Sequence, residues 1–301
     1  MIDWQGVYPA TTTQFNDDES LNIEETQRVI DMLIKDGVDG IIALGTVGEN
    51  CSLRAEEKRD VIAAVKEVAN GRVPVISGVS QFTTAEACEY ARDAEKIGID
   101  GLMVLPAMVY KSDRRETLAH YKAVAQASDL PVMVYNNPVT YGIDITIDMF
   151  EELQGLANIV AVKESTADTR RVTEMFNAFG DRFTVFTGVD DIALESILMG
   201  CTGWISGLTN AFPQESVALF KLARAGRIQE AVEIYRWFMP LLRLDTIPTL
   251  VQCIKLAEQV MGRGSEMVRA PRLPLVGEER KRVIGIVEHA AANRPTLPTD
   301  I

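Results

Sequence analysis

The sequence predicts an α/β protein, a (β/α)8 TIM barrel followed by a C-terminal helical extension. Three observations support this fold class. Eight short apolar runs recur along the chain, segments of helix length separate them, and only helical patterns follow residue 213. Near-continuous hydrophobic strands that alternate with helices are typical of parallel βαβ units. Eight such units indicate a closed barrel.

The expected strands can be read directly from the apolar runs. They are GVYPAT (6–11), GIIAL (40–44), VPVISG (73–78), GLMVLP (101–106), PVMVYN (131–136), IVAVKE (159–164), FTVFTG (183–188) and GWISG (203–207). The segments between them carry helix signals. Asn22 is the expected N-cap of the first helix, and Gly37, Gly71 and Gly98 are expected to end the first three helices.

After about residue 213 the strand signal fades. The segments FPQESVALFKLARAG, RIQEAVEIYRWFMPLLRLD, IPTLVQCIKLAEQVMG and EERKRVIGIVEHAAA all have helical patterns. We therefore expect a barrel at 1–212 and a helical extension at 213–301 that packs on it. The rival fold is an open doubly wound sheet, which usually carries a glycine-rich phosphate loop after its first strand. The corresponding segment here, PATTTQFND, contains no glycine.

Composition excludes several classes of function. The 301 residues include 43 acidic and 30 basic side chains, for a net charge of −13. This balance argues against binding to nucleic acid or to an anionic membrane. No apolar run reaches the ~18–20 residues of a membrane span. The first residues, MIDWQGVYPATTTQF, show no export signal, so we expect a cytoplasmic protein.

Metal chemistry has few candidate ligands in this chain. His120 and His289 are the only histidines, and they lie 169 residues apart. A histidine-rich zinc or iron centre cannot be built from them within one chain. His120 is expected to be structural or on the surface, and His289 to be solvated. The cysteines, Cys51, Cys88, Cys201 and Cys253, match no zinc or redox spacing and are expected to be small buried hydrophobes.

In a barrel of this kind, function lies at the carboxyl ends of the strands. Lys163 ends the run IVAV, and lysine is rarely buried without a reason. Burial favours a neutral, nucleophilic amine that can form a Schiff base with a ketone. The alternative is a structural lysine paired with a carboxylate such as Glu164.

Two hydroxyl groups are expected near Lys163. Tyr135 ends the preceding strand and could relay protons, or it could be a rim tyrosine bonded to backbone. Thr46 ends another strand, in the loop GTVGEN (45–50), whose backbone N–H groups could hold a carboxylate. Such a loop could also be only a tight turn.

These residues carry a resemblance to a known family. The chain resembles the dihydrodipicolinate synthase / N-acetylneuraminate lyase family of class I Schiff-base lyases in GVYPATTTQF, GTVGE, YNNP, VAVKES and the C-terminal RAPRLPL. The resemblance implies imine formation at Lys163 and a proton relay through Tyr135 and Thr46. It implies that the amides of Thr46 and Val47 hold a substrate carboxylate. It also implies a homotetramer that needs no cofactor and no metal.

Further residues at the strand ends are expected to bind the substrate, a small molecule. They are Asn137 and Thr140 after the fifth run, and Ile205, Ser206 and Gly207 in the last one. Asn136, Tyr141 and Thr209 could hydrogen-bond substrate hydroxyls or only satisfy loop backbone.

Three positions depart from the synthase pattern. Val47 replaces a second threonine, and Thr140 replaces an arginine that grips a second carboxylate. Met108 stands where the synthase has a tyrosine, and Tyr110 lies two residues later. A threonine cannot replace a bidentate guanidinium.

We therefore expect a cofactor-independent lyase that forms a lysine imine with a 2-oxo acid or a cyclic imine carboxylate. Candidate activities are a hydroxypyrroline-carboxylate deaminase and a keto-deoxy sugar acid dehydratase or aldolase. The alternatives are dihydrodipicolinate synthase proper, a metal-dependent aldolase, or a ligand-binding barrel without catalysis.

Overall fold

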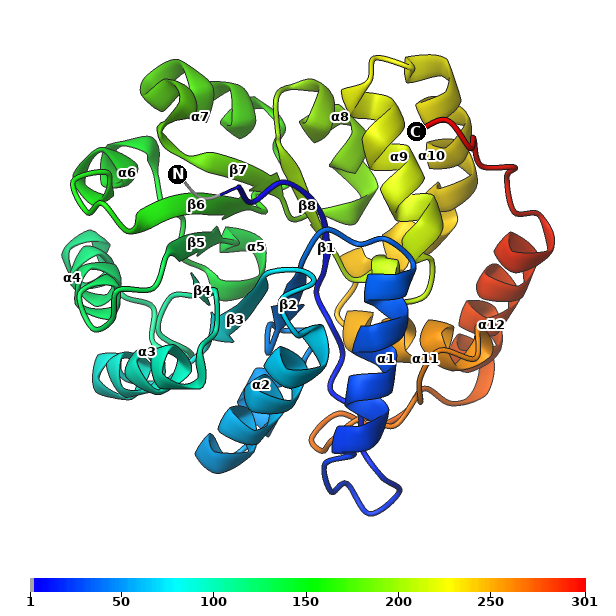
Figure 1. The fold of residues 1–301 in the computed structure, drawn as a ribbon, viewed down its shortest axis with the longest axis horizontal. Coiled ribbons are helices and arrows are strands. Elements are labelled where there is room, and N and C mark those ends of the chain that lie inside the picture. Colours follow the sequence, from blue (N-terminus) through cyan, green and yellow to red (C-terminus); the bar gives the residue numbers. More distant parts are fainter. Residues whose placement is uncertain (1–2) are drawn as a thin grey trace.

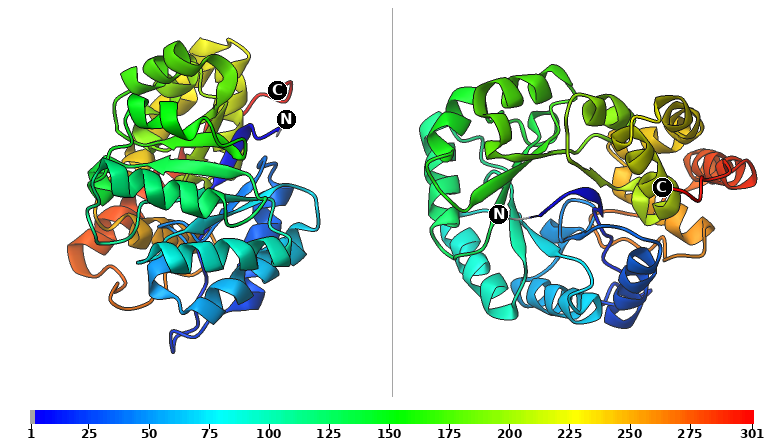
Figure 2. Two further views of the ribbon diagram at one scale, coloured as in Figure 1. Left: turned by 90° about the vertical axis from the view of Figure 1, so that its left-hand side faces the viewer. Right: turned by 45° about the horizontal axis from the view of Figure 1, so that its top comes forward.

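The structure, a computed structural model, describes residues 3–301 and contains one eight-stranded parallel sheet. Its strand order is β1-β8-β7-β6-β5-β4-β3-β2. A parallel bridge between Ala10 and Ile42 joins the two outermost strands, so the sheet closes on itself. Helices surround the strands in a ring (Figures 1 and 2). The (β/α)8 TIM barrel predicted from the sequence is confirmed.

Each strand overlaps one of the predicted apolar runs. The strands are β1 (Gly6–Pro9), β2 (Ile41–Ala43), β3 (Val75–Val79), β4 (Gly101–Val104), β5 (Val132–Asn136), β6 (Ile159–Glu164), β7 (Thr184–Thr187) and β8 (Gly203–Ser206). The helices that alternate with them are α1 (Ile23–Lys35), α2 (Ala55–Ala69), α3 (Thr84–Ile97), α4 (Arg114–Ala125), α6 (Ile147–Leu153), α7 (Arg170–Phe179), α8 (Ala193–Leu198) and α9 (Pro213–Arg224).

Local signals set the helix ends where the sequence predicts them. The Asn22 side chain accepts a hydrogen bond of 2.9 Å from the N–H of Glu25 and so caps α1. Gly98 adopts a φ of 88° and ends α3, which is a conformation that side chains with a Cβ disfavour.

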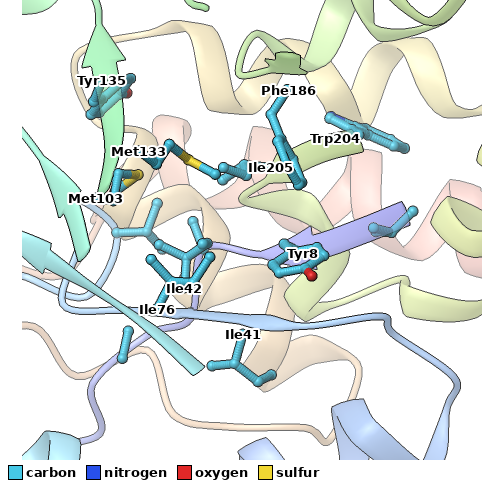
Figure 3. Close-up of a cluster of buried hydrophobic side chains, with 14 of the residues drawn as sticks. Tyr8, Ile41, Ile42, Ile76, Met103, Met133, Tyr135, Phe186, Trp204 and Ile205 are labelled. Atoms are coloured by element: carbon cyan, nitrogen blue, oxygen red, sulfur yellow. The ribbon is translucent and has the colours of Figure 1, made fainter. Parts of the chain in front are cut away.

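The interior of the barrel is filled by large apolar side chains from most of the strands. Figure 3 shows Tyr8, Ile42, Met103, Met133 and Phe186 meeting there. The rings of Tyr8 and Phe186 pack edge to face, with 5.1 Å between their centroids. This packed interior leaves the carboxyl ends of the strands as the open face, where Tyr135 stands above Met133 on β5 (Figure 3).

The C-terminal helices α10 (Ile228–Leu242), α11 (Leu250–Val260) and α12 (Gly277–Ala292) lie together beside the barrel (Figure 1). Helix α9 contacts β1, α8 and α10, so it stands where the barrel's eighth helix belongs. The division at residue 212, which assigns α9 to the extension, stays a prediction. A buried ion pair ties the extension to the barrel, because Lys255 on α11 lies 3.0 Å from Glu49 in the loop after β2.

The structure corrects one expectation about the cysteines. Cys201 and Cys253 are buried, but Cys51 is exposed and Cys88 is only partly buried. Cys51 lies in the one-turn 3-10 helix η1 (Asn50–Ser52) at the surface, so its neighbours in the sequence do not cover it. His120 is structural, since its ring bonds Thr84 and the Leu105 carbonyl, and His289 is exposed.

Within residues 3–301, no helix is both long and apolar enough to cross a membrane. The same residues contain no group of three or more His, Cys, Asp or Glu side chains arranged to hold a metal ion.

Candidate active site

Lys163 and Tyr135 face each other at the carboxyl ends of neighbouring strands. The β5–β6 register pairs their Cα atoms directly. The Lys163 Nζ lies over the Tyr135 ring, 4.1 Å from its centroid. Both side chains are buried, with exposed fractions of 6% and 5%. The structure thus brings together the two residues that the sequence selected as an amine and its proton relay.

Burial tunes the Lys163 amine toward nucleophilic chemistry. Desolvation lowers the pKa of Lys163 to about 8, and the nearby charges of Asp245 and Asp190 act in the opposite direction. Glu164 forms no salt bridge with Lys163 in residues 3–301. Its carboxylate accepts hydrogen bonds from the Thr166 N–H at 2.7 Å and from Asn136 at 3.1 Å. The alternative of a structural Lys163–Glu164 pair therefore finds no support in the geometry.

The Tyr135 hydroxyl is held by a side chain two residues along the chain. Asn137 donates to it from Nδ2 at 3.0 Å, and the Asn137 Oδ1 accepts from the Thr140 N–H at the start of the one-turn helix α5 (Pro138–Tyr141). Burial raises the pKa of Tyr135 to about 12. The hydroxyl therefore stays protonated at neutral pH and can donate a proton.

Thr46 makes a different contact from the expected one. Its hydroxyl hydrogen-bonds the Tyr141 hydroxyl, and no hydrogen bond joins Thr46 to Tyr135 within the described part of the chain. The Tyr141 ring packs edge to face on Tyr135, with 5.7 Å between centroids. Burial raises the pKa of Tyr141, while the bond to Thr46 lowers it. A relay from Thr46 would therefore pass through Tyr141, and its catalytic role stays a prediction.

The other predicted binding residues have different surroundings. Val47 and Ile205 are buried, with exposed fractions of 5% and 1%. The Ser206 hydroxyl already donates to the Asp190 carboxylate at 2.9 Å. Thr140 is exposed on α5, and the hydrogen bonds of the described residues include none from its side chain. Tyr110 is 59% exposed, and its hydroxyl donates to Glu116 rather than toward Lys163.

Sequence reasoning missed a pair of acidic side chains beside Lys163. Asp190 follows β7 in the segment TGVDD (187–191), and Asp245 comes from the 3-10 helix η5 (Arg243–Thr246) in the extension. The segments that carry them, η3 (Asp190–Ile192) and η5, pack on each other. The sequence offers one weak indication of Asp245. It is an acidic residue between the apolar helix α10 and the segment IPT (247–249), where the helical pattern breaks.

The sequence profile of the Dihydrodipicolinate synthetase family matches residues 3–290. The chain belongs to this family.

Relatives and solved structures agree with that assignment. The chain is 30% identical to a 4-hydroxy-tetrahydrodipicolinate synthase from Methanothrix thermoacetophila, over 93% of this chain and 95% of that one. It superposes on the dihydrodipicolinate synthase from Aquifex aeolicus with a TM-score of 0.92 at 30% identity, covering 96% and 98% of the two chains. It superposes on YagE, a family member from E. coli K12 in complex with pyruvate, with a TM-score of 0.91 at 29% identity, covering 96% and 99%. The protein is therefore an enzyme, a lyase of the class I type.

Proposed function

We propose that the protein is a cofactor-independent lyase that forms an imine between Lys163 and a 2-oxo acid or a cyclic imine carboxylate. The observation that carries the proposal is the buried Lys163 amine, 4.1 Å from the centroid of the Tyr135 ring. Its lowered pKa supplies neutral amine near physiological pH. The crystal structure of YagE with pyruvate supports a 2-oxo acid as the class of ligand.

The chain's own residues suggest how the reaction proceeds. The neutral Lys163 amine adds to the substrate carbon that bears the carboxylate, and the backbone amides of Thr46 and Val47 hold that carboxylate. Tyr135 donates a proton as the carbinolamine loses water, and it takes a proton back when the imine is hydrolysed. The protonated imine then withdraws electrons from the neighbouring carbon, which permits cleavage, dehydration or deamination.

The substrate is proposed to carry a single carboxylate next to its reacting carbon. Thr140 stands where the resemblance to the synthase calls for an arginine, and its side chain is exposed on α5. A hydroxyl cannot replace a bidentate clamp on a second carboxylate. We therefore favour a hydroxypyrroline-carboxylate deaminase, in which Lys163 attacks the ring imine, the 4-hydroxyl leaves, and hydrolysis releases ammonia and 2-oxoglutarate semialdehyde. A keto-deoxy sugar acid dehydratase or aldolase would use the same first steps.

One observation favours a second candidate, the synthase itself. Several relatives of 30–32% identity are named 4-hydroxy-tetrahydrodipicolinate synthase. The test is to incubate purified protein with 4-hydroxy-1-pyrroline-2-carboxylate and to measure ammonia, with 2-keto-3-deoxy sugar acids and pyruvate plus aspartate semialdehyde in parallel. Ammonia release supports the deaminase. Pyruvate release from the sugar acid supports the aldolase, and rapid condensation with aspartate semialdehyde overturns the argument from Thr140.

We also propose a homotetramer, on the resemblance alone, and the cytoplasmic location expected from the sequence stays a prediction. Sedimentation of the purified protein tests the assembly. A monomer at micromolar concentration would contradict it.

A further inference from the structure

The Asp190 carboxylate is fully buried and accepts three hydrogen bonds. The Trp204 indole N–H donates to Oδ1 at 3.0 Å, while the Ser206 hydroxyl and the Leu208 N–H donate to Oδ2 at 2.9 and 3.3 Å. A carboxyl group that accepts three hydrogen bonds is favoured in its ionised form. Burial nevertheless raises the pKa of Asp190 to about 6. Of the two acids Asp190 and Asp245, Asp190 is therefore the one that hydrogen bonds hold in place and that carries the negative charge.

Asp245 is the second acid, and fewer donors surround it. It lies against Gly207, whose added Cβ would stand 2.7 Å from Asp245 Oδ1. Burial, and then repulsion from Asp190, raise the pKa of Asp245 well above its ordinary value. The two carboxyl groups lie against the same short segment, 206–208, so each disfavours the ionised form of the other. Asp190 accepts three hydrogen bonds and Asp245 accepts none among those of the described residues, so the charge is favoured on Asp190 and the proton on Asp245.

This pair lies near the reacting amine and an unsatisfied hydroxyl. Asp190 comes two residues after Gly188, where an added Cβ would lie 2.5 Å from Lys163 Cε. The charges of Asp245 and Asp190 both act on Lys163. The Ser165 Oγ is buried without a hydrogen-bond partner in the described residues. Ser165 also lies against Gly188, because the same added Cβ would stand 2.2 Å from Ser165 Oγ. An unpartnered hydroxyl at this place is available to a bound substrate.

We propose that the Asp190–Asp245 pair holds one proton beside Lys163 and that Asp245 donates it to the hydroxyl that leaves the Lys163-bound substrate. This inference rests on the proposed function. C2 is the substrate carbon bonded to the Lys163 nitrogen, and C4 carries the hydroxyl that leaves. In this step the nitrogen lone pair of the enamine re-forms the C2=N bond, and the electron pair of the C2=C3 double bond moves to form C3=C4. The C4–O bond breaks, and the oxygen departs as water with the proton from Asp245. Asp245 is left ionised and regains a proton from solvent, so no oxidant or reductant is needed.

The test separates imine chemistry from loss of the hydroxyl. Asp245→Asn keeps the size of the side chain but removes the transferable proton. Imine formation is read as a borohydride-stable adduct with pyruvate, and enamine formation as deuterium uptake into the pyruvate methyl group. We expect both to stay within about threefold of wild type, while ammonia release from 4-hydroxy-1-pyrroline-2-carboxylate falls by roughly 100-fold or more. Asp191→Asn is the matched control, because it makes the same substitution next to Asp190 on η3, the 3-10 helix that packs on η5.

Three results overturn the inference. One is Asp245→Asn turnover within threefold of wild type. Another is a parallel loss of adduct, exchange and turnover, which marks Asp245 as merely structural. The third is a wild-type protein that forms the adduct but removes the hydroxyl from neither the pyrroline nor a 2-keto-3-deoxy acid. A wild-type protein that forms no adduct instead refutes the proposed function itself, and with it this inference.

Discussion

Replacing Lys255 tests how the extension supports the loop that carries Thr46. The Lys255 Nζ bonds Glu49 at 3.0 Å and the Thr13 carbonyl at 2.7 Å, and both members of the ion pair have exposed fractions of 0%. Lys255→Met removes the cation that bonds the buried Glu49 and leaves only the Arg272 guanidinium, 3.9 Å from Glu49 Oε2. Breaking a buried pair from one side costs about 3–5 kcal/mol.

That cost converts into a measurable shift. With ~2.1 cal/mol/K of unfolding entropy per residue over 301 residues, 3–5 kcal/mol corresponds to a fall in Tm of about 5–8 °C. The assay is calorimetry of the purified variant, with Lys281→Met as the control. Lys281 pairs with Glu278 at the surface, where both side chains are more than 70% exposed, so no measurable shift is expected. A fall below 2 °C for Lys255→Met would refute the reasoning, and the double variant with Glu49→Gln should recover part of the loss.

Three further predictions concern catalysis. Tyr135→Phe removes only the hydroxyl and should lower turnover by about 10²–10⁴-fold with an unchanged Tm; a loss under threefold would show that Tyr135 has no part in proton transfer. Tyr141→Phe and Thr46→Val break the same hydrogen bond, so their losses in turnover should be similar and the double variant should lose no more than either one; additive losses would contradict a shared relay. The rate of adduct formation with pyruvate should rise with pH and level off above a midpoint near pH 8, because burial lowers the pKa of Lys163 to about 8; a midpoint above pH 10 would contradict this environment.

The sequence was a sufficient guide wherever the signal is local. Apolar runs predict the buried strands, and Asn22 predicts the start of a helix, because both features depend on residues that are neighbours in the sequence. The meeting of Tyr135 and Lys163 also follows, since adjacent parallel strands end at the same face of the barrel.

Features that depend on tertiary packing were beyond reach. Asp245 lies beside Asp190 only because η5 packs on η3, and nothing near residue 245 in the sequence indicates that contact. Thr46 meets Tyr141 rather than Tyr135 because the single turn of α5 brings residue 141 back over the site. Cys51 is exposed because its 3-10 turn lies at the surface, which its small neighbours could not indicate.

The most direct measurement of the central claim is the mass of the protein after incubation with pyruvate and borohydride. The wild type should gain one covalent adduct per chain, located on Lys163 by peptide mapping, and Lys163→Ala should gain none while keeping its fold by circular dichroism. Lys163→Arg should also gain none, because a guanidinium stays protonated. An adduct of full yield in Lys163→Ala, or one mapped to another lysine, would contradict the account.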